Sequence, residues 1–414
     1  MSSNGKTPSK ILKWRLECLG HSVVEGMAGC LPGRAVYRIG EMLGSLACTL
    51  MPQRRKTVMR NLRIAFAGEK DASELHEMMK QTFRRSGGNL ISAAHTSRLS
   101  PADLAEVMTI QNFQLLLDVL AEGKGVVLLL SHMGNWEVLS RMIHLFPKGA
   151  KTGAFYRPLN NPLLDERVLA RRQADGTRMF SKRDNPLHVA AFLREGGIVG
   201  ILADQRVGPK GELTEFFGRI TRASPLPALL ARRAKATVLS LAVTTDRPGH
   251  WTSTFMPVEA PQHTAHCMVA LEKAMKSGPL DVFWLQERWK VYLGKNLTVR
   301  QWLGEDSLQG GKAHRALLWL VDAPASWVLP ADWQHPDVCY EIALAEDQPI
   351  PEPWSHDAII HRVPRGDGLH QMKQAILKID SSAALPLDFI LAPHGGAALA
   401  KVAKLETIPL VHLS

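Results

Sequence analysis

Cysteine is scarce in this chain of 414 residues: there are 5, far apart in the sequence and without a Cys-x-x-Cys pair. This spacing argues against a disulfide scaffold and a cysteine-based zinc site, and it favours a reducing compartment. No run of about 18 uncharged apolar residues is present, so we expect no membrane-spanning helix. The N-terminus also lacks the apolar core and cleavage site of a signal peptide. No metal site is predicted.

Signatures of nucleic-acid binding are missing as well, since there is no zinc-finger spacing, RNA-binding aromatic motif or long basic arm. The chain is nevertheless basic, with a formal net charge of +11. Residues 301–414 hold 8 basic and 14 acidic side chains, whereas the first 300 hold 42 and 25. The basic part therefore indicates an anionic partner, such as a phospholipid surface, a phosphorylated substrate or an acidic carrier protein. The change near residue 300 marks a domain boundary.

Helices and short apolar strands alternate after residue 109, which predicts a largely parallel sheet covered by helices on both faces. The predicted strands are 125–131, 151–156, 198–203 and 237–243, and the predicted helices are 135–146, 163–173, 186–195 and 225–233. A polar, glycine-rich stretch at 304–312 predicts a linker. Beyond it, residues 313–414 predict a small appended α/β domain, with strands at 315–321, 339–345, 358–363 and 388–392 and helices at 368–379 and 397–405.

The first 60 residues contain two apolar stretches at roughly helical spacing, followed by the basic residues Arg54, Arg55, Lys56 and Arg60. One interpretation is a pair of membrane-associating helices that rests on an anionic leaflet, with the basic side chains at the level of the headgroups. The other is an ordinary helical hairpin packed on the protein core. Apolar helix faces look alike in the two cases, so the sequence leaves both open.

The chemistry is concentrated in Ser131–Glu137 (SHMGNWE), directly after the first predicted strand. His132 and Glu137 are five residues apart, and on one continuous helix they would face different directions. They can meet if His132 lies in the turn and Glu137 in the first helical turn, and Gly134 and Asn135 suit a tight turn and a helix N-cap. A carboxylate on one imidazole nitrogen leaves the other basic, so the pair could deprotonate a substrate hydroxyl. The alternative is a loop histidine beside a glutamate that complements the helix dipole.

Further motifs follow in a fixed order: YRPLNNPLLD at 156–165, GILADQ at 200–205 with FFG at 216–218, and WLQERWK at 284–290. Together with SHMGNWE and RRKTVMRNLRIAF at 54–66, they make the chain resemble the late lipid A acyltransferases, the lauroyl/myristoyl transferases of Gram-negative outer-membrane biosynthesis. The resemblance covers about residues 10–295. It implies a glycerolipid-acyltransferase-like fold, a mixed α/β sheet flanked by helices, with the catalytic domain at 61–303.

The resemblance also implies the reaction. A fatty acyl chain would pass from acyl carrier protein to a hydroxyl of a lipid A precursor, without a cofactor, at the cytoplasmic face of the inner membrane. The implied partners are the carrier protein, the lipid A precursor and the anionic membrane surface, and no nucleic acid.

Individual roles follow from the matched motifs. His132 would be the general base and Glu137 its orienting partner. Arg157 would be a charged donor to the acceptor phosphate or to the thioester oxyanion, a choice that stays open. Asp204 and Gln205 end a buried strand, where the sites of α/β proteins usually lie. They are expected, with Asn135 from the first motif, to bind substrate.

Two features leave alternatives open. Gln286 and Glu287 stand where the family commonly shows histidine and a basic residue, so the acyl-chain length and the acceptor, including another glycolipid or phospholipid, are undecided. Residues 388–413 vaguely resemble half of the Rossmann-like, nucleotide-sugar-binding part of heptosyltransferase-type glycosyltransferases, although His394 replaces an expected acidic residue. A non-catalytic scaffold whose C-terminal domain binds a nucleotide sugar or a partner is therefore the rival from a different class.

Overall fold

The computed structural model describes residues 8–66, 68–181, 184–208, 210–289, 314–324, 326–351, 354, 358–365, 368–393, 396–406 and 408–413. It divides into two compact units that are interleaved along the chain. The first unit comprises Met1–Leu50, Lys80–Gln205 and Ser224–Phe283, and the second comprises Met51–Met79, Arg206–Ala223 and Trp284–Ser414. The second unit thus takes three stretches of the expected catalytic domain, residues 61–79, 206–223 and 284–303. The expected linker at 304–312 lies outside the described residues.

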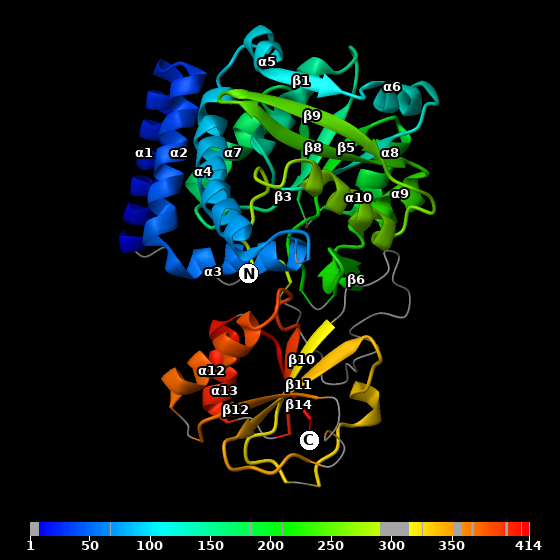
Figure 1. Ribbon diagram of the computed structural model, residues 1–414. Coiled ribbons are helices and arrows are strands. Elements are labelled where there is room, and N and C mark those ends of the chain that lie inside the picture. Colours follow the sequence, from blue (N-terminus) through cyan, green and yellow to red (C-terminus); the bar gives the residue numbers. More distant parts are fainter. Residues whose placement is uncertain are drawn as a thin grey trace. The chain divides into compact units, whose positions relative to one another are not determined.

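The first unit is built on a seven-stranded sheet with the order β1-β9-β8-β2-β5-β3-β4 (Figure 1). Neighbouring strands are parallel except β8 and β9, which form an antiparallel hairpin. The bounds are β1 Met108–Gln111, β2 Val126–Leu130, β3 Thr152–Tyr156, β4 Arg178–Ser181, β5 Ile198–Leu202, β8 Thr237–Arg247 and β9 His250–Pro257. Strand β2 is buried along its whole length, as its unbroken apolar run predicts. The mixed sheet confirms the predicted fold class.

Helices accompany the sheet at or near the predicted positions. Three of the four predicted helices are confirmed, as α7 Pro162–Gln173, α8 Pro186–Arg194 and α9 Leu226–Ala234. The fourth differs, because Trp136–Leu145 forms the 3-10 helix η1 in place of an α-helix. The other helices with residues in this unit are α1 Pro8–Cys30, α2 Gly33–Leu50, α4 Ala72–Thr96, α5 Pro101–Val107, α6 Gln114–Ala121 and α10 Thr264–Ser277.

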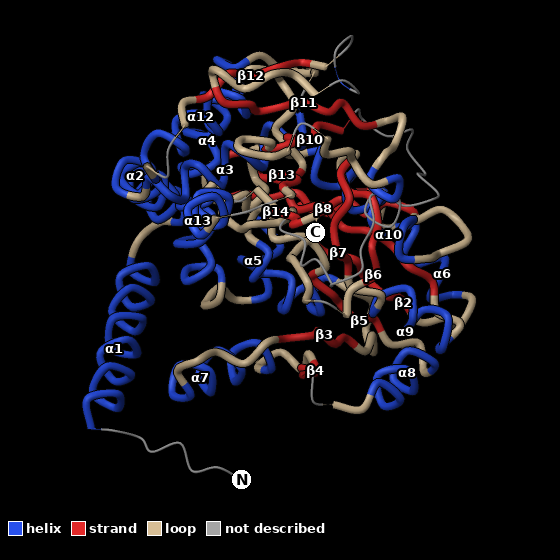
Figure 2. The backbone as a smooth tube through the Cα atoms, turned by 90° about the horizontal axis from the view of Figure 1, so that it is seen from below, coloured by secondary structure: helices blue, strands red, loops and turns tan. Residues whose placement is uncertain are grey.

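The two N-terminal helices leave apolar side chains in solvent. One side of α2 packs closely on α4, where a Cβ added to Gly40 would lie 2.5 Å from the carbonyl oxygen of Gly87. Helix α1 lies next to α7 (Figure 2). The exposed apolar residues recur at helical spacing on both helices: Leu12, Leu16, Leu19, Val23 and Met27 on α1, and Ile39, Met42, Leu43, Leu46 and Leu50 on α2. Within the described part of the chain, no helix combines the length and apolar character needed to cross a membrane.

The second unit contains a five-stranded parallel sheet with the order β12-β11-β10-β13-β14. The strands are β10 His314–Trp319, β11 Val338–Ala345, β12 Ile359–Val363, β13 Phe389–Ala392 and β14 Leu410–His412. Helices α12 Leu369–Ser381 and α13 Ala397–Leu405 pack on one face, and Trp333 of the short helix η2 (Ala331–Trp333) joins the core on the other. Residues 314–413 therefore form an α/β sheet, and whether they are a separate domain stays a prediction. The unit also holds α3 Pro52–Phe66 and the antiparallel hairpin of β6 Glu212–Phe216 and β7 Arg219–Ala223.

Three of the four basic residues named at the start of α3 have partners within the second unit. Lys56 Nζ lies 3.0 Å from a carboxylate oxygen of Glu406. Arg60 donates to the carbonyl of Leu387 at 2.7 Å, and Arg54 donates to that of Leu285 at 3.0 Å. Partners within the chain are compatible with either interpretation of the N-terminal helices, and both stay open.

Candidate active site

His132 lies in a tight turn at the carboxyl end of β2. Gly134 adopts φ +56°, and a Cβ there would lie 2.4 Å from the carbonyl oxygen of Val243, so the turn requires glycine. Two backbone hydrogen bonds fasten the turn to one neighbouring segment. Phe283 N donates to the carbonyl of His132 at 2.8 Å, and Gly134 N donates to that of Asp281 at 2.9 Å. The predicted turn conformation is confirmed.

Asp204 holds both the backbone and the ring of His132. Its Oδ2 accepts the His132 backbone N–H at 3.0 Å, and its Oδ1 lies 2.6 Å from His132 Nδ1. The strand register explains the meeting, because Leu130 of β2 pairs with Leu202 of β5 and both side chains lie two residues further on. Two bonds to one carboxylate fix the position and the orientation of the imidazole.

Glu137, the partner predicted for His132, binds elsewhere. Its carboxylate accepts from Arg172 Nη2 at 2.7 Å and from Arg172 Nε at 3.1 Å. Glu137 is the second residue of η1, and this short helix aims its side chain at α7. The predicted His132–Glu137 bond is thus corrected to a His132–Asp204 bond. Arg172 was not singled out from the sequence, in which it is one of several arginines on a polar helix.

The surroundings of His132 favour a basic imidazole. Burial lowers the pKa of His132, but the charge of Asp204 and its hydrogen bond raise it, and Glu137 raises it further. The outcome is a pKa above the ordinary value of 6.5. With Nδ1–H donating to Asp204, the lone pair is on Nε2, where the side-chain amide nitrogen of Gln205 donates at 2.9 Å. A hydroxyl that reaches Nε2 in place of this amide would meet a strong general base.

Arg157 and Asn135 are the remaining residues that the sequence analysis expected at the site. Arg157 is exposed and directly follows β3, the neighbour of β5, so it lies at the same edge of the sheet as His132 and Asp204. Asn135 is buried and caps η1 by position, but its side chain makes no cap bond to the helix. Its Nδ2 donates to Thr96 Oγ1 of α4 at 3.0 Å, a contact that stabilises the turn.

One aromatic side chain contacts the imidazole. The rings of Trp136 and His132 meet edge to face with centroids 5.2 Å apart, and the ring of Phe283 lies 5.7 Å from that of Trp136. The described residues contain no group of three or more His, Cys, Asp or Glu side chains placed to hold a metal ion. The arrangement is that of a general base with an orienting carboxylate, which suits the transfer of an acyl group to a hydroxyl.

Comparison with known proteins agrees with this chemistry. The bacterial lipid A biosynthesis acyltransferase family matches residues 5–291, which include every residue described at the site. A lipid A biosynthesis lauroyltransferase of Escherichia coli (strain K12) is 25% identical over 271 residues, a span of 63% of this chain and 87% of the relative. The chain therefore belongs to the bacterial lipid A biosynthesis acyltransferase family and is an acyltransferase.

Proposed function

We propose that the protein transfers a fatty acyl chain from acyl carrier protein to a hydroxyl group of a lipid A precursor, with His132 as the general base. The observation that carries this proposal is the 2.6 Å contact between His132 Nδ1 and Asp204 Oδ1 at the end of two buried parallel strands. Family membership and the similarity to a lauroyltransferase support the acyl group and the acceptor.

In the proposed reaction, His132 Nε2 takes the proton of the acceptor hydroxyl, and the hydroxyl oxygen attacks the carbonyl carbon of the thioester. A carbon–oxygen bond forms, the carbon–sulfur bond breaks, and the imidazolium returns the proton to the leaving thiolate. Asp204 stabilises the imidazolium through Nδ1–H, as the carboxylate does in serine hydrolase triads. General base catalysis of this kind contributes about 10²–10⁴-fold to the rate. The Gln205 amide must leave Nε2 before the hydroxyl can bind.

Arg157 supplies positive charge at the same edge of the sheet, either to the acceptor phosphate or to the thioester oxyanion. The kinetics of Arg157→Ala separate the two roles. Loss of a phosphate contact raises KM for the lipid, whereas loss of an oxyanion contact lowers kcat, because only the second interaction strengthens in the transition state.

We place the reaction at the cytoplasmic face of the inner membrane. The exposed apolar residues of α1 and α2 form stripes at helical spacing, as expected for helices that lie in a bilayer interface. The basic charge of the first 300 residues suits both the phosphates of the acceptor and an acidic carrier protein.

The test is acyl transfer by the purified protein in detergent, with a lipid A precursor and either lauroyl- or myristoyl-acyl carrier protein. Mass spectrometry should show the acceptor heavier by one acyl group, and the donor that reacts identifies the chain. We expect His132→Ala and Asp204→Asn to lose at least about 100-fold of the activity. No product from folded wild-type protein beside a working control enzyme would contradict the proposed acceptor or donor. Product that survives in both variants would contradict the proposed base.

A further inference from the structure

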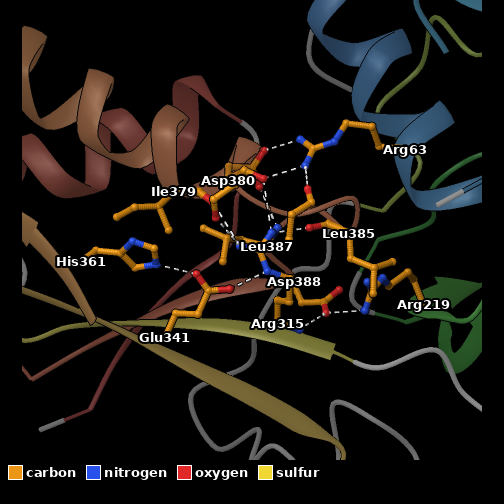
Figure 3. A network of polar contacts seen from close by, with 12 residues as sticks. Arg63, Arg219, Arg315, Glu341, His361, Ile379, Asp380, Leu385, Leu387 and Asp388 are labelled. Carbon is orange, nitrogen blue, oxygen red and sulfur yellow. Dashed lines mark hydrogen bonds and ion pairs between the residues drawn. The ribbon is translucent and has the colours of Figure 1, made fainter. Parts of the chain in front are cut away.

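The C-terminal domain (residues 314–413) contains Asp388, whose carboxylate binds a buried arginine of the β6–β7 hairpin. Asp388 Oδ2 lies 2.5 Å from Arg219 Nη1, 3.0 Å from the backbone nitrogen of Arg315 and 3.2 Å from His314 Nδ1 (Figure 3). Arg219 is only 1% exposed. A buried guanidinium needs an anion beside it, and this one comes from about 170 residues further along the chain.

Helix α3 is held by the same domain. Arg63 Nη1 lies 2.7 Å from Asp380 Oδ2, and Arg60 donates to the carbonyl of Leu387 at 2.7 Å. The charges are complementary, because α3 holds five basic and no acidic side chains whereas residues 301–414 are net acidic. Within the second unit, the C-terminal domain is thus bound to two segments of the family's matched region.

These segments are joined to each other as well. Asn61 Nδ2 of α3 donates to the carbonyls of Trp284 and Gln286 at 2.8 and 2.7 Å. Arg288 donates from Nη1 to Thr221 Oγ1 of the hairpin at 3.2 Å. Helix α3, the hairpin and residues 284–289 are therefore bonded to one another within the second unit. We call these three the supported segments, because residues 314–413 bind α3 and the hairpin.

Two of these segments directly follow residues of the site in the sequence. Arg206, at the start of the hairpin segment, directly follows Gln205, whose amide donates to His132 Nε2. Trp284 directly follows Phe283, whose backbone nitrogen donates to the carbonyl of His132. Two peptide bonds thus link the supported segments to direct neighbours of the base.

We propose that Arg219 and Asp388 are positioning residues for acyl transfer, through which the C-terminal domain fixes the segments adjoining Gln205 and Phe283. The proposal rests on the function proposed above. A shift of about 1 Å at a reacting group can cost a factor of about 100 in rate. Loosening these segments should therefore lower kcat more than it changes KM.

The experiment compares full-length Arg219→Gln, Asp388→Asn and the double variant with wild type. Hydrogen exchange of the backbone amides in residues 212–223 and 284–289 measures how firmly these segments are held. The values of kcat and KM measure the effect on the reaction. We expect each single variant to speed exchange and to lower kcat by about tenfold at unchanged KM. The double variant should lose less than the two singles combined, because each single already breaks the Arg219–Asp388 ion pair.

Two controls separate positioning from general destabilisation. Arg365→Gln removes exposed ion pairs with Asp322 and Asp347 at the opposite end of the strands, and it should change neither readout. Glu341→Gln removes the partner of Arg315 inside the C-terminal domain. It should speed exchange within that domain more than in residues 212–223.

Unchanged exchange at 212–223 in both single variants would overturn the proposal. Faster exchange with wild-type kcat would also overturn it, because the ion pair would then hold the hairpin without affecting catalysis by His132. Failure of wild type to transfer an acyl group would instead contradict the proposed function, and the exchange data would still decide whether Asp388 holds the hairpin.

Discussion

Glu137 and Arg172 form a two-point ion pair that joins η1 to α7, with Oε1 2.7 Å from Nη2 and Oε2 3.1 Å from Nε. The two charges act on His132 in opposite directions, since Glu137 raises its pKa and Arg172 lowers it. Arg171, the residue before Arg172 in α7, is ion-paired with Glu25 of α1. Helix α7 therefore connects an N-terminal helix with the electrostatic surroundings of the base.

The first prediction is that Glu137→Gln moves the pH dependence of the reaction toward lower pH. The base must be neutral to accept a proton, so kcat/KM falls as the pH drops through the pKa of His132. Wild type, with a raised pKa, should show this fall above pH 6.5. Removing the charge of Glu137 lowers that pKa, whereas Arg172→Gln should raise it and move the fall the other way. The measurement is kcat/KM against pH for the two variants.

The double variant Glu137→Gln/Arg172→Gln serves as the control, and its profile should lie between those of the singles. Complete loss of activity in Glu137→Gln at every pH, with the fold intact, would contradict the assignment of Asp204 as the hydrogen-bond partner of His132.

The second prediction concerns the turn that holds the base. Gly134→Ala places a Cβ 2.4 Å from the carbonyl oxygen of Val243 at a residue with φ +56°. We expect the variant to lose at least about 2 kcal/mol of unfolding free energy, because the backbone strain and the steric clash add. Urea unfolding measures the loss. Gly123→Ala is the matched control, since that glycine has φ +71° with no atom within 4 Å of the added Cβ, so it should lose less.

The strands and the turn could be predicted from the sequence because each depends on a local pattern. The run GVVLLLS predicts β2, and glycine after the histidine predicts the turn. The partner of His132 could not be predicted, because it depends on which strands pair and in what register. Glu137 is close in sequence, whereas Asp204 is 72 residues away and is brought in by the pairing of β2 with β5.

The same reason applies to the basic helix α3. Its sequence shows that Arg60 and Arg63 require partners, but a phospholipid surface and the Asp380 carboxylate satisfy a guanidinium equally well. Helix α12 provides that carboxylate from 317 residues along the chain. Charge complementarity between distant segments is visible in the composition only as the difference between a basic and an acidic part.

The third prediction is that the apolar stripes of α1 and α2 bind membranes. Leu16 and Leu46 are more than half exposed, and burying such a side chain stabilises binding by about 1.5–3 kcal/mol. Leu16→Glu and Leu46→Glu should each reduce co-sedimentation with anionic phospholipid vesicles by about tenfold or more. Ile359→Glu, at a half-exposed position in the second unit, is the control and should bind as wild type does. Equal binding by all variants would contradict the membrane surface proposed here.

The last prediction is that acid weakens the second unit through its buried carboxylates. Burial raises the pKa of Asp388, but Arg219, His314 and the backbone of Arg315 lower it by more, so it is held below the ordinary value. Burial likewise raises the pKa of Glu341, and the bonds from His361 and Arg315 bring it below the ordinary value. Folded-state pKa values below those of the unfolded chain stabilise the fold above about pH 4, and this stability is lost as the pH falls through the folded values.

The urea concentration at the unfolding midpoint of wild type should therefore stay constant between about pH 7 and pH 5, and it should fall steeply below about pH 4. Asp388→Asn should have a lower urea midpoint at neutral pH, because its ion pair with Arg219 is lost. That midpoint should decline less on acidification, because one titrating group is gone. Urea unfolding of both proteins across this range measures the two slopes. Parallel curves would mean that the pKa of Asp388 is the same in the folded and unfolded chains, and they would contradict the ion pair with Arg219.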